Sequence, residues 1–257
     1  MIRRALFAAA ACALMHATSA TAATCDSLAV LPLQNAHVTA AQMVAAGTFT
    51  PPAPPVAPGR EGAAGRAGAA GREGAAGRGG ARGGGRGNQP SPYAMLPSFC
   101  RVAVTLTPSS DSDIRIEVWL PTQWNGRFQA VGNGAWAGTI PYGPMAGALL
   151  EGYATAGTDT GHVGNNAAFA IGHPEKIIDL GYRSVHEMTV QAKTLINSFY
   201  GRAQQFSIWN GCSQGGRQGI TAAVRYPTDF DGVIAGAPAV NWMNLHAGRM
   251  AANRAAN

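Results

Sequence analysis

The pentapeptide GCSQG at residues 211–215 has the G-x-S-x-G spacing of a serine nucleophile, with Ser213 at its centre. Residues 205–211 before it have the pattern of a short buried strand, and residues 215–227 after it have that of a helix. A nucleophile needs this strand–turn–helix setting, because the sharp turn lifts the serine hydroxyl clear of the sheet. We therefore predict Ser213 to be a nucleophile; the alternative is a glycine-rich turn with an idle serine.

Two backbone N–H groups are expected to face the oxyanion that such a serine generates. Gln214 follows the nucleophile, so its N–H would lie at the positive end of the predicted helix. The second donor is expected in the glycine-rich loop VGNGAWAG at residues 131–138, with Gly132 as first choice and Gly134 as second. The alternative is a tight turn that only packs Trp136.

A serine nucleophile also needs a histidine base and a carboxylate that orients it. His246 is the single histidine after Ser213, but it follows the end of a predicted strand and is a poor candidate. His162 could line the mouth of a pocket or form local hydrogen bonds. The remaining candidates are predicted to be structural or turn-capping residues: Asp229, Asp231, His173 and His186. Both partners of Ser213 therefore stay unassigned.

The elements that would position these residues alternate between strands and helices. Residues 101–108 and 113–121 alternate apolar and polar side chains and predict two antiparallel strands. Further strands are expected within 127–138, 153–159, 205–211 and 230–239, with helices at 37–47, 185–201 and 215–227. In the first helix Thr39 would be the cap and Gly47 the end. This order predicts an α/β sheet whose later strands are parallel.

The formal net charge of +6 comes from two short segments. Two arginines stand near the N-terminus, and residues 59–87 hold six arginines and two glutamates. The basic and acidic residues of the rest of the chain cancel. The body of the protein is therefore neutral, and we expect no nucleic-acid partner.

Residues 1–23 have the features of a secretory signal peptide: two arginines, a short apolar run, and small residues before a cleavage site near Ala20 to Ala23. The apolar run is too short for a membrane span of about 20 residues. An uncleaved anchor and a lipid-modified Cys12 are the alternatives. We expect a secreted or periplasmic protein with no membrane contact after cleavage.

Export would permit disulfides. Cys25 and Cys100 flank the low-complexity part of the chain and are a plausible pair. Cys212, directly beside Ser213, is then left without a partner.

Residues 51–90 are rich in proline, glycine and arginine and predict a disordered, linker-like insertion between an N-terminal segment at 24–50 and a packed domain at 91–257. Glycine recurs at every third position from 59 to 83, as it does in collagen. The triplets contain no proline, so a solvated linker is favoured over a triple helix.

Several long motifs resemble the tannase/feruloyl esterase family. That family is similar to the aromatic-ester hydrolases that complete polyester breakdown, such as mono(2-hydroxyethyl) terephthalate hydrolase. The motifs are PSFCRVAV, EVWLPTQWNGRF, VGNGAWAG, GYATAGTDTGH, HPEKIIDLGYRSVHEMT, NGCSQGGRQG and RYPTDFDGVIAGAPAVNW. They cover the chain from about residue 25 to 248, apart from the linker.

The resemblance implies an α/β-hydrolase fold with a lid domain after the strand that follows the nucleophile helix. It implies a triad in the chain order serine, aspartate, histidine, with Ser213 as the serine. It also implies that Cys212 pairs with a cysteine next to the catalytic histidine, and that a calcium site lies in the lid. We expect no cofactor in this chain, because no position here inherits that site.

The chain departs from the family pattern after Ser213. A lid, an aspartate and a His-Cys pair would all lie beyond residue 257, and the chain stops in AANRAAN without a closing element. We therefore expect the N-terminal part of a secreted carboxylic-ester hydrolase for aromatic acyl esters, with little or no activity of its own. The alternatives are a non-catalytic binding or structural protein with a Gly-x-y segment, and a peptidase or lipase of the same fold.

Overall fold

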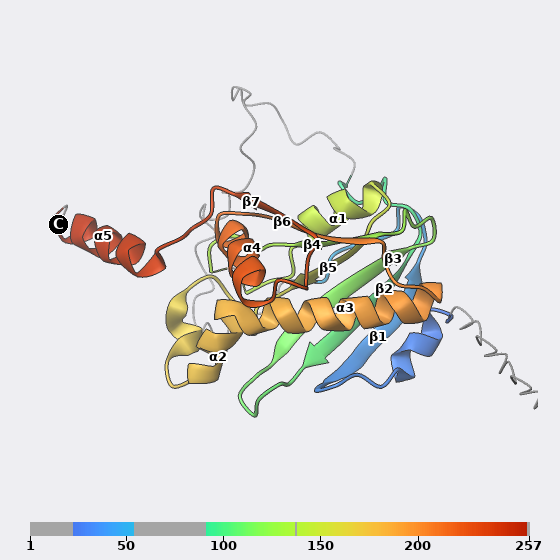
Figure 1. Cartoon of the computed structure of the whole chain (residues 1–257), viewed down its shortest axis with the longest axis horizontal. Coiled ribbons are helices and arrows are strands. Elements are labelled where there is room, and N and C mark those ends of the chain that lie inside the picture. The colour runs from blue at the N-terminus through green and yellow to red at the C-terminus, as the bar shows by residue number, and fades with distance from the viewer. Residues whose placement is uncertain (1–22, 54–90, 137, 256–257) are drawn as a thin grey trace, which may run out of the picture.

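The computed structural model describes residues 23–53, 91–136 and 138–255 (Figure 1). All but the last residue of the predicted signal peptide, and nearly all of the predicted linker, lie outside these residues. Within them, seven strands form one sheet in the order β1-β2-β3-β5-β4-β6-β7. The strands are β1 (Ala36–Val44), β2 (Phe99–Leu106), β3 (Ile114–Pro121), β4 (Arg127–Val131), β5 (Ala154–Thr158), β6 (Phe206–Cys212) and β7 (Gly232–Gly236).

The sheet is mixed, as the α/β prediction requires. β1, β2, β3 and β5 pair antiparallel in succession, and the predicted hairpin partners meet between Phe99↔Pro121 and Leu106↔Ile114. β5, β4, β6 and β7 are parallel to one another. Because parallel strands end at the same edge, the residues that follow these four strands lie along one edge of the sheet, which we call the carboxyl edge.

The helix predicted at residues 37–47 is wrong, because this segment forms β1 instead. Its backbone pairs with β2 along its whole length, from Ala36↔Leu106 to Val44↔Phe99. Thr39, the expected cap, lies at a shift in register and its hydroxyl donates to the Ala103 carbonyl at 3.1 Å. Alanine prefers helix by less than about 1 kcal/mol per residue, whereas an available sheet edge satisfies a strand's backbone groups. The tertiary partner therefore decided this segment.

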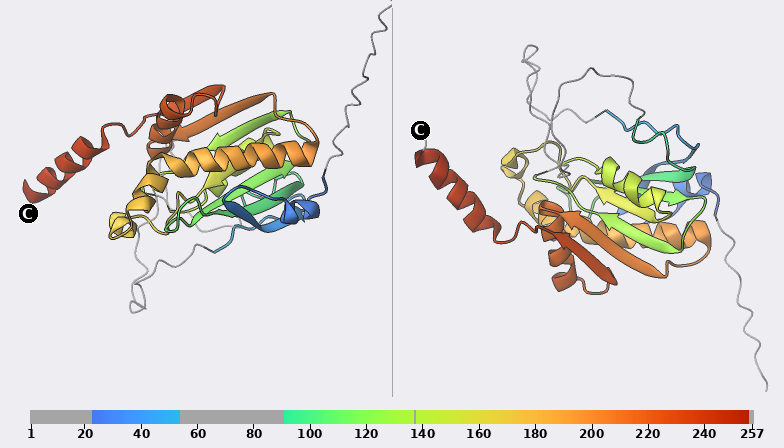
Figure 2. Two further views of the ribbon diagram at one scale, coloured as in Figure 1. Left: turned by 60° about the horizontal axis from the view of Figure 1, so that its bottom comes forward. Right: turned by 90° about the horizontal axis from the view of Figure 1, so that it is seen from above.

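Helices cover both faces of the sheet (Figures 1 and 2). α3 (Ser184–Tyr200) packs on β3 and β5, and α4 (Gln214–Arg225) packs on β6 and β7 beside it. α1 (Tyr142–Leu150) covers the opposite face. The other helical elements are η1 (Asp26–Val30), η2 (Ala167–Ala170), α2 (Pro174–Ile178), η3 (Asp179–Arg183) and α5 (Trp242–Ala255). The helices predicted at 185–201 and 215–227 are thus confirmed within two residues.

The sheet separates two hydrophobic cores. Neighbouring residues of one strand alternate between them: Phe99 and Trp119 belong to the core under α1, whereas Cys100 and Val118 belong to the core under α3. This alternation follows from the two-residue period of a strand. The sheet that carries the site is therefore anchored from both sides.

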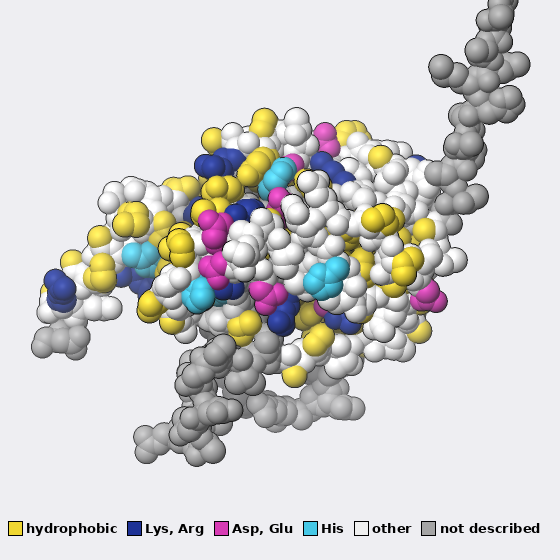
Figure 3. Space-filling model, turned by 90° about the horizontal axis from the view of Figure 1, so that it is seen from below, with side chains coloured by type: hydrophobic (Ala, Val, Ile, Leu, Met, Phe, Trp, Pro, Cys, Tyr) yellow, Lys and Arg dark blue, Asp and Glu magenta, His cyan; other side chains and the backbone are white. Residues whose placement is uncertain are grey.

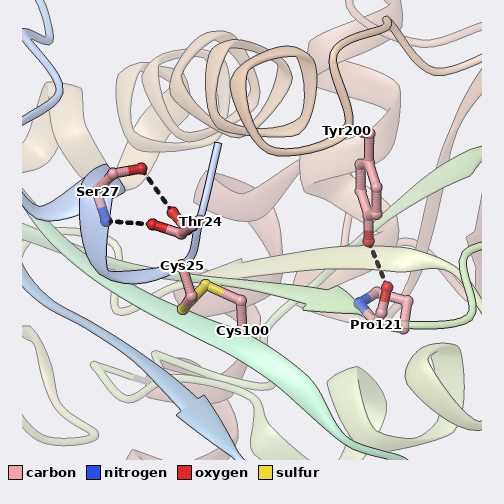
Figure 4. The surroundings of a disulfide bond; sticks show 6 residues. All are labelled: Thr24, Cys25, Ser27, Cys100, Pro121 and Tyr200. Atoms are coloured by element: carbon pink, nitrogen blue, oxygen red, sulfur yellow. Dashed lines mark hydrogen bonds between the residues drawn. A yellow bond between two sulfur atoms is a disulfide. The ribbon is translucent and has the colours of Figure 1, made fainter. Parts of the chain in front are cut away.

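The predicted pairing of Cys25 with Cys100 is confirmed. Figure 4 shows the bond between the start of η1 and β2, with a Cα–Cα distance of 5.6 Å. The bond closes a loop with a sequence separation of 75, which contains the predicted linker. Constraining such a loop in the unfolded chain is worth about 4 kcal/mol by loop-closure entropy. This disulfide fastens the N-terminal segment to the sheet across the insertion.

The charges on one face of the molecule agree with a neutral body. On the face shown in Figure 3, basic and acidic side chains lie next to one another instead of gathering into a patch of one sign. Among the described residues, no helix combines the length and the apolar character that a bilayer crossing would require.

Candidate active site

Ser213 occupies the sharp turn between β6 and α4, as predicted from its motif. Its backbone angles are φ 59° and ψ −115°, a strained conformation for a residue with a Cβ atom. The turn is held by its own peptide groups: the Ser213 N–H donates to Gly236 O at 2.9 Å, and Ser213 O accepts from the N–H of Ala239 at 3.0 Å. The side chain is exposed at the carboxyl edge. The geometry is that of a nucleophile elbow.

Glycines in the motif and in the loop after β4 are required by backbone contacts. A Cβ atom on Gly211 would lie 2.6 Å from the carbonyl oxygen of Gly215, and one on Gly132 would lie 2.5 Å from the Gly215 Cα. No side chain fits at such distances. The loop after β4 and the first turn of α4 therefore touch backbone to backbone beside Ser213.

The structure distinguishes between the candidate oxyanion donors. The Gln214 N–H lies in the first turn of α4 and has no acceptor among the described residues. The Gly132 N–H donates to Asn210 O at 2.9 Å, extending the ladder between β4 and β6. The first choice for the second donor was therefore wrong, because this N–H is already used by the sheet. Gly134 is exposed, has open space around it, and its N–H has no acceptor in the described part of the chain.

His186 and Asp229 form the hydrogen-bonded pair that a triad would need, but in the wrong place. His186 Nδ1 lies 2.9 Å from Asp229 Oδ2, and its ring stacks on Tyr226 at 3.7 Å. Tyr226 directly follows α4, whose 12 residues separate it from Ser213 by roughly 18 Å. The pair therefore lies at the far end of α4 from the serine, in agreement with the predicted structural role.

The other acid and histidine candidates are held in local contacts. Asp231 accepts the N–H of Ser207 at 2.7 Å and so caps the pairing of β6 with β7. His173 contacts Asp111 at 2.8 Å on the surface. His246 packs against two tryptophan rings that also contact each other, Trp136 and Trp242, each at 5.4 Å from its ring.

His162 follows β5 at the carboxyl edge and is buried there, with 4% of its surface exposed. Its ring stacks on Phe169 at 3.8 Å, and Nδ1 lies 3.2 Å from the Thr160 hydroxyl. Burial lowers the pKa of His162, so its imidazole is neutral at pH 7. Within the described residues, no histidine or carboxylate hydrogen-bonds the Ser213 hydroxyl.

A buried carboxyl group that no sequence motif singled out, Asp159, lies at the same edge. Burial raises its pKa to about 7, although Oδ1 accepts the N–H groups of Gly161 and Arg115 at 2.9 Å each. It lines a cavity of about 480 Å³ together with Arg115 and Tyr142. An aspartate after a buried strand was the only signal for it. In the described ranges, no group of three or more His, Cys, Asp or Glu side chains is arranged to hold a metal ion.

Asn133 and Gln218 were also missed, although Asn133 stands between the two glycines proposed as donors. They form a buried amide pair that joins the loop after β4 to α4. The one free cysteine of the described residues is Cys212, which is exposed beside Ser213, as expected.

The chain matches a known protein family over most of its length. A sequence model described as "Tannase and feruloyl esterase" matches residues 100–256, more than half of the chain. The chain belongs to the tannase and feruloyl esterase family. The match contains β4, the Ser213 turn and the amide pair.

The chain aligns with only part of the length of its relatives in the tannase and feruloyl esterase family. A probable feruloyl esterase B-1 of Aspergillus fumigatus is 45% identical over 147 residues, which are 57% of this chain and 28% of that protein. One of Aspergillus oryzae is 43% identical over 159 residues, or 62% of this chain and 29% of that protein. The chain thus spans less than a third of the curated relatives it matches.

Solved structures confirm the α/β-hydrolase fold predicted for this family member. The crystal structure of feruloyl esterase B from Aspergillus oryzae aligns with a TM-score of 0.68 and 35% identity, over 86% of this chain and 38% of that one. Tannin acyl hydrolase from Aspergillus niger has the same fold, with a TM-score of 0.58 and 23% identity over 84% of this chain and 37% of that one.

Proposed function

We propose that this chain is the nucleophile-bearing part of a secreted ester hydrolase for aromatic acyl esters, such as feruloyl or galloyl esters. The observation that carries the proposal is the strained Ser213 turn, which presents an exposed hydroxyl beside a helix N–H without an acceptor in the described residues. Membership of the tannase and feruloyl esterase family supports the ester class. The features of residues 1–23 support export.

In the proposed reaction, Ser213 Oγ attacks the ester carbonyl while a base takes the hydroxyl proton. The carbonyl oxygen becomes an oxyanion, which the N–H groups of Gln214 and Gly134 stabilise, since neither has an acceptor among the described residues. The alcohol leaves with a proton, and an acyl group remains on Ser213. Water then attacks this ester and releases the aromatic acid. No cofactor of this chain takes part in these steps.

The base and the carboxylate that orients it are proposed to belong to the part of such an enzyme that this chain does not span. The described residues support this, since the more buried of their two Asp–His pairs, His186 with Asp229, lies at the far end of α4 from Ser213. Cys212 is proposed to pair with a cysteine in that same part, because it is exposed and free beside Ser213.

The test supplies the missing base from solution. The purified 257-residue chain is mixed with p-nitrophenyl ferulate, with and without imidazole, and the acyl group on Ser213 is measured by mass spectrometry. We expect imidazole to raise the rate of acylation at least tenfold, because a general base contributes roughly 10²–10⁴-fold when well placed. The p-nitrophenolate leaves and imidazole carries away the serine proton. Ser213→Ala should give no acyl adduct at this turn.

Two outcomes would contradict the proposal. One is a chain that is never acylated at Ser213 while it remains folded by circular dichroism. The other is p-nitrophenolate release that is the same for the wild-type chain and Ser213→Ala at every imidazole concentration.

A further inference from the structure

The buried amide pair of Asn133 and Gln218 joins the two segments that carry the proposed oxyanion donors. Gln218 Oε1 accepts the backbone N–H of Asn133 at 3.0 Å, and Gln218 Nε2 donates to Asn133 Oδ1 at 3.0 Å. The two residues are 85 positions apart in sequence and only 3% and 2% exposed. Hydrogen bonds between fully buried amides are costly to lose, because each unpaired group stays desolvated.

Backbone groups determine which way both amides point. The Asn133 N–H needs an oxygen, so the Gln218 amide must present Oε1 to it. Asn133 Nδ2 donates to the carbonyls of Thr158 at 2.7 Å and Thr139 at 3.1 Å, so Oδ1 must face Gln218. Asn133 therefore ties together the end of β5, the far end of its own loop and helix α4.

Each half of the pair lies next to a proposed donor. Gln218 is one helical turn after Gln214, and Asn133 directly precedes Gly134. A backbone contact between Gly132 and Gly215 also brings the same two segments together. The distance between the two donors is thus set by this contact and by the amide pair. Oxyanion donors act only when they lie within about 2.7–3.1 Å of the developing charge.

We infer that Asn133 and Gln218 are positioning residues that hold the Gly134 and Gln214 N–H groups at one oxyanion site. The inference rests on the proposed function of Ser213. Neither side chain needs to touch the substrate. Loss of the pair would let the loop after β4 move relative to α4, and a displacement of about 1 Å costs on the order of 10²-fold in rate.

The test measures acylation of Ser213 by p-nitrophenyl ferulate in the presence of imidazole, for the full chain and three variants. Gln218→Leu removes both hydrogen bonds of the pair. Gln218→Glu keeps the acceptor for the Asn133 N–H but places a second oxygen against Asn133 Oδ1. Gln191→Leu is the matched control, since Gln191 is 3% exposed and donates to Gln34 O from α3, away from the site.

We expect Gln218→Leu to lower the maximal acylation rate by roughly 10- to 100-fold, with the half-saturating ester concentration changed less than about threefold. Gln191→Leu should acylate within about twofold of the wild-type chain. Gln218→Glu should be slow at pH 8 and approach the wild-type rate, measured at the same pH, as the pH falls. Protonation of the introduced carboxyl group restores a donor to Asn133 Oδ1, a rescue that a merely structural residue would not show.

The outcomes separate this inference from the proposed function. One outcome is that the wild-type chain is acylated at Ser213 and both folded Gln218 variants are acylated at the same rate as wild type. That result would overturn the inference and leave the proposed function standing. A wild-type chain that is not acylated at Ser213 would overturn both. If Gln218→Leu does not fold, the pH dependence of Gln218→Glu decides, and a rate ratio to wild type that is constant with pH would count against the inference.

Discussion

The two ends of helix α4 carry complementary parts of the chemistry that a serine hydrolase needs together. At its N-terminal end, Ser213 occupies a strained turn beside N–H groups without acceptors among the described residues. At its C-terminal end, His186 and Asp229 form a hydrogen-bonded pair, and the His186 ring stacks on Tyr226. An Asp–His pair is therefore not a catalytic feature by itself. Its distance from a nucleophile decides what it can do.

The ends also differ in how tightly the backbone is packed. Near Ser213, glycines allow main chains to approach within contact distance, whereas side chains make the contacts at the far end. A substitution that adds one carbon atom should therefore have its largest effect beside the serine. Three sets of variants test this difference.

The first prediction compares Gly132→Ala with Gly134→Ala. A Cβ atom on Gly132 would lie 2.5 Å from the Gly215 Cα, whereas one on Gly134 meets nothing within 4 Å. We expect Gly132→Ala to lower the free energy of unfolding by about 2–3 kcal/mol, because the backbone on both sides must shift. Gly134→Ala should change it by less than about 0.5 kcal/mol. Urea denaturation measures both, and equal losses would show that the close backbone contact is not real.

The second prediction concerns the buried carboxyl group of Asp159, at the same edge of the sheet as Ser213. Its pKa is raised from 3.8 to about 7, so between these values the folded chain keeps a proton that the unfolded chain releases. The free energy of unfolding should therefore fall as the pH rises from 4 to 7. Asp159→Asn keeps the acceptor for the Arg115 and Gly161 N–H groups without a titrating proton. It should remove this slope and raise stability at pH 8 by on the order of 2 kcal/mol.

Urea denaturation at pH 4, 6 and 8 is the measurement for Asp159. A variant that follows the wild-type pH dependence at all three values would show that another group carries the proton.

The third prediction concerns the far end of α4. His186→Ala should lower the free energy of unfolding by about 1 kcal/mol, because it removes a partly buried hydrogen bond and a ring contact. His173→Ala is the control: its contact with Asp111 is equally short, but the histidine side chain is 51% exposed, so the loss should be below about 0.5 kcal/mol. The rate of imidazole-assisted acylation of Ser213 should stay within about twofold of the wild-type rate in both variants. A large loss of acylation in His186→Ala alone would contradict the separate roles of the two ends of α4 and make this pair part of the catalytic site.

The elements around the site were predictable because their signals are local. The strand before Ser213, the helix after it and the antiparallel strands of residues 99–121 all follow from hydrophobic periodicity and from turn residues. β1 was not predictable in this way. Its alanine-rich segment has a weak helical preference, and the free edge of β2 to which it pairs is more than fifty residues away in sequence.

The candidate oxyanion donors show the same division between what a local pattern predicts and what tertiary contacts decide. The glycines around position 132 predicted a loop that approaches a ligand, yet they could not say which N–H is free. Gly132 continues the ladder with Asn210, and this leaves Gly134 as the candidate. No local pattern pointed to Asn133 or Gln218, since neither residue type is unusual in a loop or a helix.

The sequence was enough to predict the α/β class and the strand–turn–helix setting of Ser213, and to name Cys25 and Cys100 as a candidate pair that the structure confirms. Each of these depends on a short-range pattern or on the position of the cysteines. The tertiary structure was needed to show which N–H groups lack an acceptor among the described residues, that Asn133 meets Gln218, and that His186 pairs with Asp229 far from the serine. The physical reason is that hydrogen-bond partners distant in sequence are chosen by packing, and packing depends on the whole chain.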